Sequence, residues 1–247
     1  MKTALVLSAG GMFGAYQAGA WKVLSQTFRP DIVVGASIGA MNGWAIAGGC
    51  PPGTLTEMWL DLDRLSSYRW RIPSRLQHGL VDSVHVESLI QRVHGQFKPR
   101  MEFGAVVTRT KRLQPVLFQA PDITWQHLAA STALLGLFSQ QRIEGCLYSD
   151  GGLQSALPIR AAVAMGAQRV IAINVLPEFP ALVRAAVSVI RKVAPFRSPV
   201  PDTLEVIRLT APPGMGSAKD GLYWNRENTA RWIAAGERDA AALKVNG

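Results

Sequence analysis

A serine stands between two glycines in Gly35-Ala36-Ser37-Ile38-Gly39, a pattern typical of a nucleophile elbow. In an elbow a strand turns sharply into a helix, and the serine is exposed at the turn. Residues 31–34 resemble a short buried strand, and residues 38–47 are rich in Ala, Ile and Met, as in a packed helix. However, no histidine follows residue 127, whereas an ordinary α/β-hydrolase carries its triad histidine after its acid. We therefore expect a group other than histidine to activate Ser37.

Asp150 is the best candidate for that group. It follows the short apolar stretch Cys146-Leu147-Tyr148 and precedes Gly151 and Gly152, which let another backbone approach closely. A carboxylate can act as a general base for a serine hydroxyl if the two side chains come within hydrogen-bonding reach. The sequence thus predicts that the region after residue 146 returns to the elbow.

A glycine-rich turn, Ser8-Ala9-Gly10-Gly11-Met12-Phe13-Gly14, lies between a predicted strand over residues 4–7 and a predicted helix over residues 15–25. N–H groups at the start of a helix have no intrahelical acceptor, so they can point at a developing negative charge. We expect this turn to supply oxyanion donors, together with the N–H of Ile38 directly after the nucleophile.

The order of the predicted elements indicates an α/β fold. The βαβα pattern over residues 4–47 calls for a mainly parallel sheet with helices on both faces. We expect further helices over residues 54–63, 84–93, 124–132, 158–165 and 226–243, strands over 103–107, 116–118, 169–175 and 204–209, and a hairpin at 111–112. Because no repeat or linker is evident, residues 1–247 are expected to form a single three-layer α/β/α domain.

The composition fits a hydrolase that meets lipid. The chain is 48% hydrophobic with a mean hydropathy of +0.13, yet no run approaches the ~18 apolar residues of a spanning helix. Its first residues do not resemble a signal peptide and its two cysteines make no disulfide framework, so we expect a cytoplasmic protein. The net charge of +9 fits peripheral contact with an anionic membrane surface as well as it fits solvated arginines. No nucleic-acid motif accompanies that charge.

Residues 177–201 carry five prolines around a predicted apolar helix over residues 181–193. Arg184 and Arg191 share one face of this helix, and most of the remaining surface is Leu, Val, Ile and Ala. The segment is interpreted as a lid or membrane-docking insertion or, more simply, as a helix that covers the sheet.

Three motifs in order make the chain resemble the patatin-like phospholipase family nearly end to end. The family's glycine-rich turn resembles residues 8–19, its elbow resembles residues 35–42, and its Asp-Gly-Gly motif resembles residues 150–152. An Ala-Ser-x-Ala segment of the family recurs at residues 130–133.

The resemblance implies a serine lipid acyl hydrolase, that is, a phospholipase A or lysophospholipase-type esterase acting on a lipid or other ester. It implies a Ser37–Asp150 catalytic dyad that needs no metal or cofactor. The implied oxyanion donors are backbone groups of Gly10, Gly11 and Met12, and the remaining motif glycines are Gly14, Gly35, Gly39, Gly151 and Gly152.

The chain departs from the family at three positions. Ala9 stands where a third glycine is usual, Phe13 where the family carries Arg or Lys, and Leu135 where a proline is common. Because Phe13 removes a basic side chain from the oxyanion turn, one alternative is a catalytically weak lipid-binding or regulatory member of the same fold.

A nucleotide-binding module is the other alternative. Ala9-x-Gly11-x-x-Gly14 after a strand nearly matches the dinucleotide fingerprint. A Rossmann unit would place an acidic residue at the end of its second strand, whereas Asp31 stands at the start of that strand. This alternative also leaves the elbow and Asp150 unexplained.

The remaining polar and aromatic residues have simpler explanations. The four histidines lack metal-ligand spacing and are interpreted as surface or packing residues; they are His78, His85, His94 and His127. Gln17 and Asn42 are expected to make local hydrogen bonds on their helices, and the tryptophans to pack in the core or under helices. Met12 and Phe13 are the side chains expected to touch the substrate.

Overall fold

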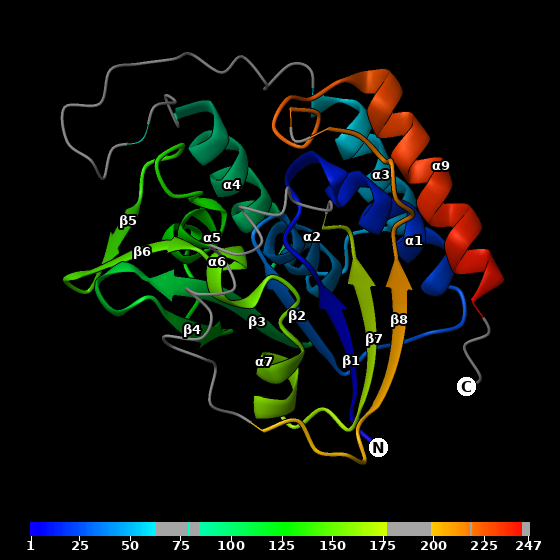
Figure 1. The fold of residues 1–247 in the computed structure, drawn as a ribbon, viewed down its shortest axis with the longest axis horizontal. Coiled ribbons are helices and arrows are strands. Elements are labelled where there is room, and N and C mark those ends of the chain that lie inside the picture. Colours follow the sequence, from blue (N-terminus) through cyan, green and yellow to red (C-terminus); the bar gives the residue numbers. More distant parts are fainter. Residues whose placement is uncertain (63–78, 80–83, 177–198, 218, 244–247) are drawn as a thin grey trace.

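The computed structural model describes residues 1–62, 79, 84–176, 199–217 and 219–243. These residues form an eight-stranded sheet with the order β5-β6-β3-β2-β1-β7-β8, in which β4 also pairs with β3 (Figure 1). The parallel strands are β1 (Thr3–Leu7), β2 (Ile32–Ala36), β3 (Glu102–Arg109), β7 (Arg169–Asn174) and β8 (Glu205–Thr210). The antiparallel strands lie beyond β3, on the side of the sheet away from β8; they are β4 (Gln114–Gln119), β5 (Gln141–Ile143) and β6 (Cys146–Asp150). The mainly parallel sheet predicted from the sequence is confirmed.

The central strands are apolar along their whole length because helices cover both of their faces. Every residue of β2 is buried, as are residues 4–7 of β1. Leu5, Leu7 and Val33 point into one core cluster, whereas Val6 and Val34 point into the other. This is the pattern expected of a parallel sheet between two helical layers.

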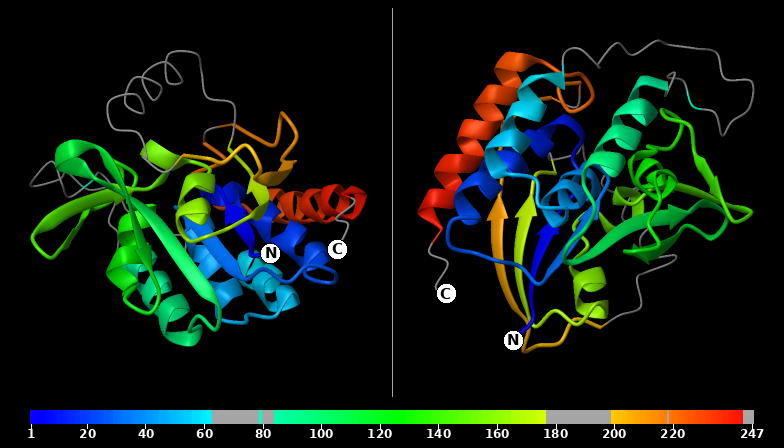
Figure 2. Two further views of the ribbon diagram at one scale, coloured as in Figure 1. Left: turned by 90° about the horizontal axis from the view of Figure 1, so that it is seen from below. Right: turned by 180° about the vertical axis from the view of Figure 1, so that it is seen from behind.

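The helices form two layers of unequal size (Figure 2). Six of them pack into the first cluster: α1 (Gly14–Leu24), α2 (Ile38–Ala47), α3 (Pro52–Leu60), α4 (Val84–Gln96), α5 (Trp125–Thr132) and α9 (Arg226–Ala242). On the opposite face α7 (Ile159–Ala164) packs against β1 and β2. The described residues thus form a three-layer α/β/α arrangement.

Close packing of α9 on α1 supports the start of α1. A Cβ at Gly19 would lie 2.1 Å from the carbonyl oxygen of Ile233, and one at Gly236 would lie 2.2 Å from a carbonyl oxygen of α1. The rings of Phe13 and Trp232 meet edge to face with centroids 4.8 Å apart. Phe13 therefore packs the short 3-10 helix η1 (Gly11–Phe13) against α9.

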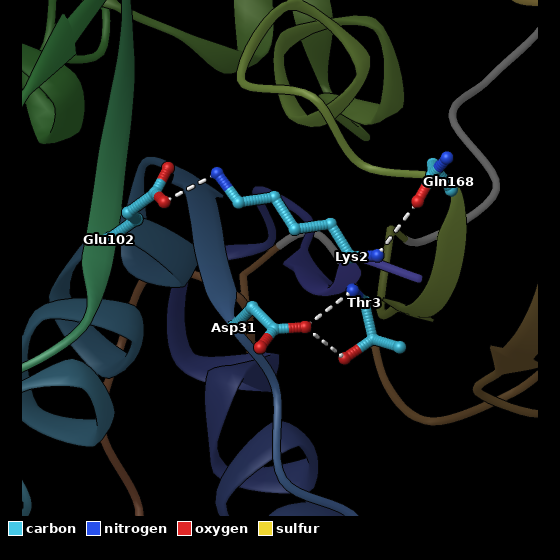
Figure 3. Close-up of polar contacts among 5 residues, drawn as sticks. All are labelled: Lys2, Thr3, Asp31, Glu102 and Gln168. Atoms are coloured by element: carbon cyan, nitrogen blue, oxygen red, sulfur yellow. Dashed lines mark hydrogen bonds and ion pairs between the residues drawn. The ribbon is translucent and has the colours of Figure 1, made fainter.

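Polar side chains tie together the amino ends of the parallel strands (Figure 3). The Lys2 backbone N–H donates to the side chain of Gln168, and the Lys2 ammonium binds Glu102. The Thr3 backbone N–H and hydroxyl both donate to Asp31, which lowers the pKa of that carboxyl. Asp31 thus bonds Thr3 at the amino ends of the strands, whereas the elbow lies at the carboxyl end of β2. A dinucleotide site would need its acidic residue at the carboxyl end.

The predicted elements agree with the structure except on one side of the sheet. Strands β5 and β6, and the short helix α6 (Gly152–Ser155), were not predicted. Most of the 177–201 segment, with its predicted helix, lies outside the described residues. No helix within the described ranges has the length and apolar character needed to cross a membrane.

Candidate active site

Ser37 occupies a sharp turn between β2 and α2. Its backbone has φ 54° and ψ −128°, a conformation that is strained for any residue other than glycine. A Cβ at Gly35 would lie 2.2 Å from the carbonyl oxygen of Gly39, and a Cβ at Gly39 would lie 2.4 Å from that of Leu7. Only glycine fits at these two positions, which explains why the serine is flanked as it is.

Strand register brings Asp150 to the elbow. Ala36 pairs with Val106 across β2 and β3, and the next residue, Val107, pairs with Asp150 across β3 and β6. Ser37 and Asp150 therefore lie in one row across the sheet, although 113 positions separate them. The Ser37 Oγ donates a hydrogen bond to Asp150 Oδ2 at 2.6 Å.

Asp150 is only 5% exposed, and both oxygens of its carboxyl group accept hydrogen bonds. Oδ1 accepts the Gly152 N–H at 2.6 Å, while Oδ2 accepts the Ser37 hydroxyl. Burial raises the pKa of Asp150 from 3.8 to about 6, although the two hydrogen bonds act in the opposite direction. Asp150 is consequently ionised at neutral pH and is a stronger base than an exposed carboxylate.

The glycine-rich turn lines the same pocket as Ser37 and Asp150. Within the described part of the chain, the N–H groups of Gly10, Gly11 and Ile38 have no hydrogen-bond acceptor. The structure differs from the sequence prediction at Met12, because its N–H donates to the carbonyl oxygen of Gly221 at 2.9 Å. Gly10, Gly11 and Ile38 are therefore the candidate oxyanion donors.

A buried polar network holds this turn in place. Asn42 Nδ2 donates to the Gly14 carbonyl at 2.9 Å and to Gln17 Oε1 at 3.0 Å, and Gln17 Nε2 donates to the Ser8 carbonyl at 2.8 Å. Trp59 Nε1 completes the network by donating to Asn42 Oδ1 at 3.0 Å. The expectation of merely local bonds at Gln17 and Asn42 was wrong, since these bonds join α1, α2 and α3.

The pocket has a volume of about 640 Å³ and is apolar beyond its base. Its walls come from α2, from α3 and α4, which lie toward the top of Figure 1 where the parallel strands end, and from the loop after α5. Representative wall residues are Met41, Leu55, Trp59, Leu89, Leu135 and Phe138. Apart from Asp150, His85 is the one ionisable side chain among its described lining residues.

The histidines away from the pocket that the structure describes make packing or capping contacts. His127 Nδ1 accepts the Thr124 N–H in a capping box at the start of α5. His94 stacks on Trp44 with centroids 4.7 Å apart. His78 lies outside the described residues. Among the residues that the structure does describe, no group of three or more His, Cys, Asp or Glu side chains could hold a metal.

Four further glycines of these motifs also permit close contacts. A Cβ at Gly151 would lie 2.0 Å from the Val106 carbonyl oxygen, and a Cβ at Gly10, Gly14 or Gly152 would approach a side-chain atom within 2.6 Å. Each of these positions therefore lets the turn, the elbow or the Asp150 segment pack against its neighbours.

The mainly parallel sheet between helices, with the sharp Ser37 turn at the end of a parallel strand, defines an α/β protein. The chain belongs to the patatin-like phospholipase family, whose model matches residues 5–163. The matched range contains the glycine-rich turn, the elbow and Asp150.

Curated relatives show a more distant similarity. The chain is 26% identical over 178 residues to Lysophospholipase nte1 of Aspergillus terreus, and 28% identical over 184 residues to Lysophospholipase NTE1 of Mycosarcoma maydis. These alignments cover 69% and 71% of this chain but only 12% and 10% of the relatives. The chain thus matches about a tenth of the length of either relative.

Solved structures show the same fold at low identity. VipD from Legionella pneumophila aligns with a TM-score of 0.51 and 12% identity, covering 98% of this chain and 66% of VipD. The type III effector protein ExoU also aligns with a TM-score of 0.51, at 15% identity, covering 98% of this chain and 52% of ExoU. At such identity the likeness concerns the fold alone.

Proposed function

We propose that this chain is a serine lipid acyl hydrolase in which Ser37 is the nucleophile and Asp150 the general base. The observation that carries the proposal is the 2.6 Å hydrogen bond from Ser37 Oγ to the buried Asp150 carboxylate. Membership of the patatin-like phospholipase family supports a lipid ester as the substrate.

In the proposed acylation step, Asp150 Oδ2 takes the Ser37 proton as Ser37 Oγ attacks the ester carbonyl. The N–H groups of Gly10, Gly11 and Ile38, which have no acceptor within the described residues, would stabilise the resulting oxyanion. When the tetrahedral intermediate collapses, the proton on Asp150 passes to the departing alcohol.

In the proposed deacylation step, Asp150 takes a proton from water as the water oxygen attacks the acyl-enzyme carbonyl. Collapse of this second intermediate releases the carboxylic acid and returns the proton to Ser37 Oγ. The raised pKa of Asp150 suits both steps, because one group must accept and then donate a proton near neutral pH.

The apolar pocket favours a long acyl chain. Its described lining residues include no lysine or arginine, and each methylene that leaves water for such a wall gains about 0.8 kcal/mol. That gain corresponds to up to about a fourfold rise in kcat/KM per methylene, provided that the chain is bound in the transition state as well.

We also propose that the mouth of the pocket meets an anionic lipid surface. Leu134 and Leu135 line the pocket and are 42% and 52% exposed, so they extend its apolar wall to the surface. The net charge of +9 would draw the protein to anionic lipid. Flotation with anionic vesicles tests this contact, and equal recovery with zwitterionic vesicles would refute the charge argument.

A panel of phospholipids, lysophospholipids and acylglycerols, analysed by mass spectrometry, tests the function. The expected result is release of free fatty acid from at least one class by the parent protein and none above background by Ser37→Ala. Lipid binding without release by the parent would favour the catalytically weak alternative. Equal release by the parent and Ser37→Ala would refute the proposed nucleophile.

A further inference from the structure

The carboxyl end of α5 lies between the elbow and the Asp150 segment. Ser131, in the last turn of this helix, is fully buried. Its Oγ accepts the backbone N–H of Ser37 at 2.9 Å and donates to the Val106 carbonyl oxygen at 2.8 Å. Its own carbonyl oxygen accepts the Gly151 N–H at 3.2 Å. One residue thus holds β3, the nucleophile turn and the residue after Asp150.

The backbone conformation of the elbow buries the Ser37 N–H, which therefore needs a hydrogen-bond acceptor. With φ at 54°, the turn aims the N–H of Ser37 at α5, in a place where Ser37 is only 8% exposed. A buried N–H without an acceptor is destabilising. The Ser131 hydroxyl supplies the acceptor, and its donation to Val106 fixes the orientation of its lone pairs.

The same segment holds the carboxylate from the other side. The Asp150 N–H donates to the Ala133 carbonyl oxygen at 2.9 Å, two residues after Ser131. Residues 131–133 therefore hold the backbones of both Ser37 and Asp150, and the Ser37 Oγ–Asp150 Oδ2 distance depends on them.

We infer that Ser131 is a positioning residue that fixes the Ser37 turn relative to the Asp150 carboxylate. This role rests on the proposed function and gives the Ala-Ser-x-Ala segment a task in it. Ser131 does not touch the reacting atoms, so it acts through the backbone of the nucleophile. Small displacements of a nucleophile cost about 10- to 100-fold in rate.

Ser149 offers a matched control. Its hydroxyl is also fully buried and donates at 3.1 Å to the Ala133 carbonyl oxygen, in the same segment. Ser149→Ala and Ser131→Ala remove the same atoms from equally buried sites, but only Ser131 bonds the nucleophile. A difference in rate between the two variants therefore reports the bond to Ser37.

The experiment measures kcat and KM on a short-chain ester, the rate of fluorophosphonate labelling at Ser37, and thermal unfolding. For Ser131→Ala we expect kcat and the labelling rate to fall about 10- to 100-fold while KM stays within threefold. Ser131→Cys should fall between this variant and the parent, because a thiol is a weaker acceptor and donor than a hydroxyl. Ser149→Ala should stay within threefold of the parent.

Equal rate losses in Ser131→Ala and Ser149→Ala would overturn the inference, since burial alone would then explain them. If Ser131→Ala does not fold, the near-isosteric Ser131→Cys decides: a labelling rate equal to that of the parent overturns the role. A parent protein that fluorophosphonate does not label at Ser37 would refute the proposed function itself, which is a different result.

Discussion

Replacing Asp150 by asparagine should abolish turnover and at the same time stabilise the fold above neutral pH. The amide is almost the same size as the carboxyl, and its oxygen can still accept the Gly152 N–H. It cannot accept the Ser37 proton, so kcat should fall at least about 100-fold. The unusual part of this prediction is the change in stability.

The magnitude follows from the pKa of Asp150. Burial raises that pKa from 3.8 to about 6, so the folded chain retains a proton that the unfolded chain releases between these two values. Stability due to this group is therefore fully present below pH ~4 and is lost as pH rises through about 6. At 1.36 kcal/mol for each pH unit, the loss amounts to up to about 3 kcal/mol.

Denaturant unfolding of the parent and Asp150→Asn between pH 4 and pH 8 measures this effect. The free energy of unfolding of Asp150→Asn should increase relative to that of the parent as pH rises, by up to about 3 kcal/mol at pH 8. A difference that stays constant from pH 4 to pH 8 would show that Asp150 titrates normally. The argument that burial tunes this base would then be wrong.

Three other outcomes are expected. In circular dichroism melts, Gly39→Ala should lower Tm by at least about 5 °C, because its Cβ would lie 2.4 Å from a backbone oxygen. Gly53→Ala is the control: its Cβ would meet nothing within 4 Å, so Tm should stay within a few degrees of the parent's. His127→Ala should lower the free energy of unfolding by about 1 kcal/mol through the lost capping box but keep kcat within threefold. A fall in kcat as large as that of Asp150→Asn would contradict the claim that the base is not a histidine. The parent's kcat should fall below pH ~6 with the protonation of Asp150, and a profile flat down to pH 4.5 would contradict that pKa.

The elements nearest the elbow were predictable from the sequence. The strand–turn–helix signals over residues 4–47 are local and strong, since apolar runs are interrupted by glycines that the turns require. The proximity of Ser37 and Asp150 was expected from chemistry and family resemblance. The sequence offers no direct signal for the strand register that brings the two side chains together.

The parts that sequence reasoning missed depend on contacts between distant segments. β5 is only three residues long and β6 ends in Ser149 and Asp150, so neither has a clear apolar pattern. Ser131 bonds a residue 94 positions away, and Asn42 bonds one 25 positions away, so neither partner is visible locally. At Met12, the acceptor Gly221 comes from a loop more than 200 residues away.

The claim that Ser37 is the nucleophile is tested most directly by covalent labelling. The parent and Ser37→Ala are treated with a fluorophosphonate, and the modified peptide is identified by mass spectrometry. The account predicts one adduct on the parent, at Ser37, and none on Ser37→Ala. An adduct at another serine, or equal labelling of the two proteins, would contradict it.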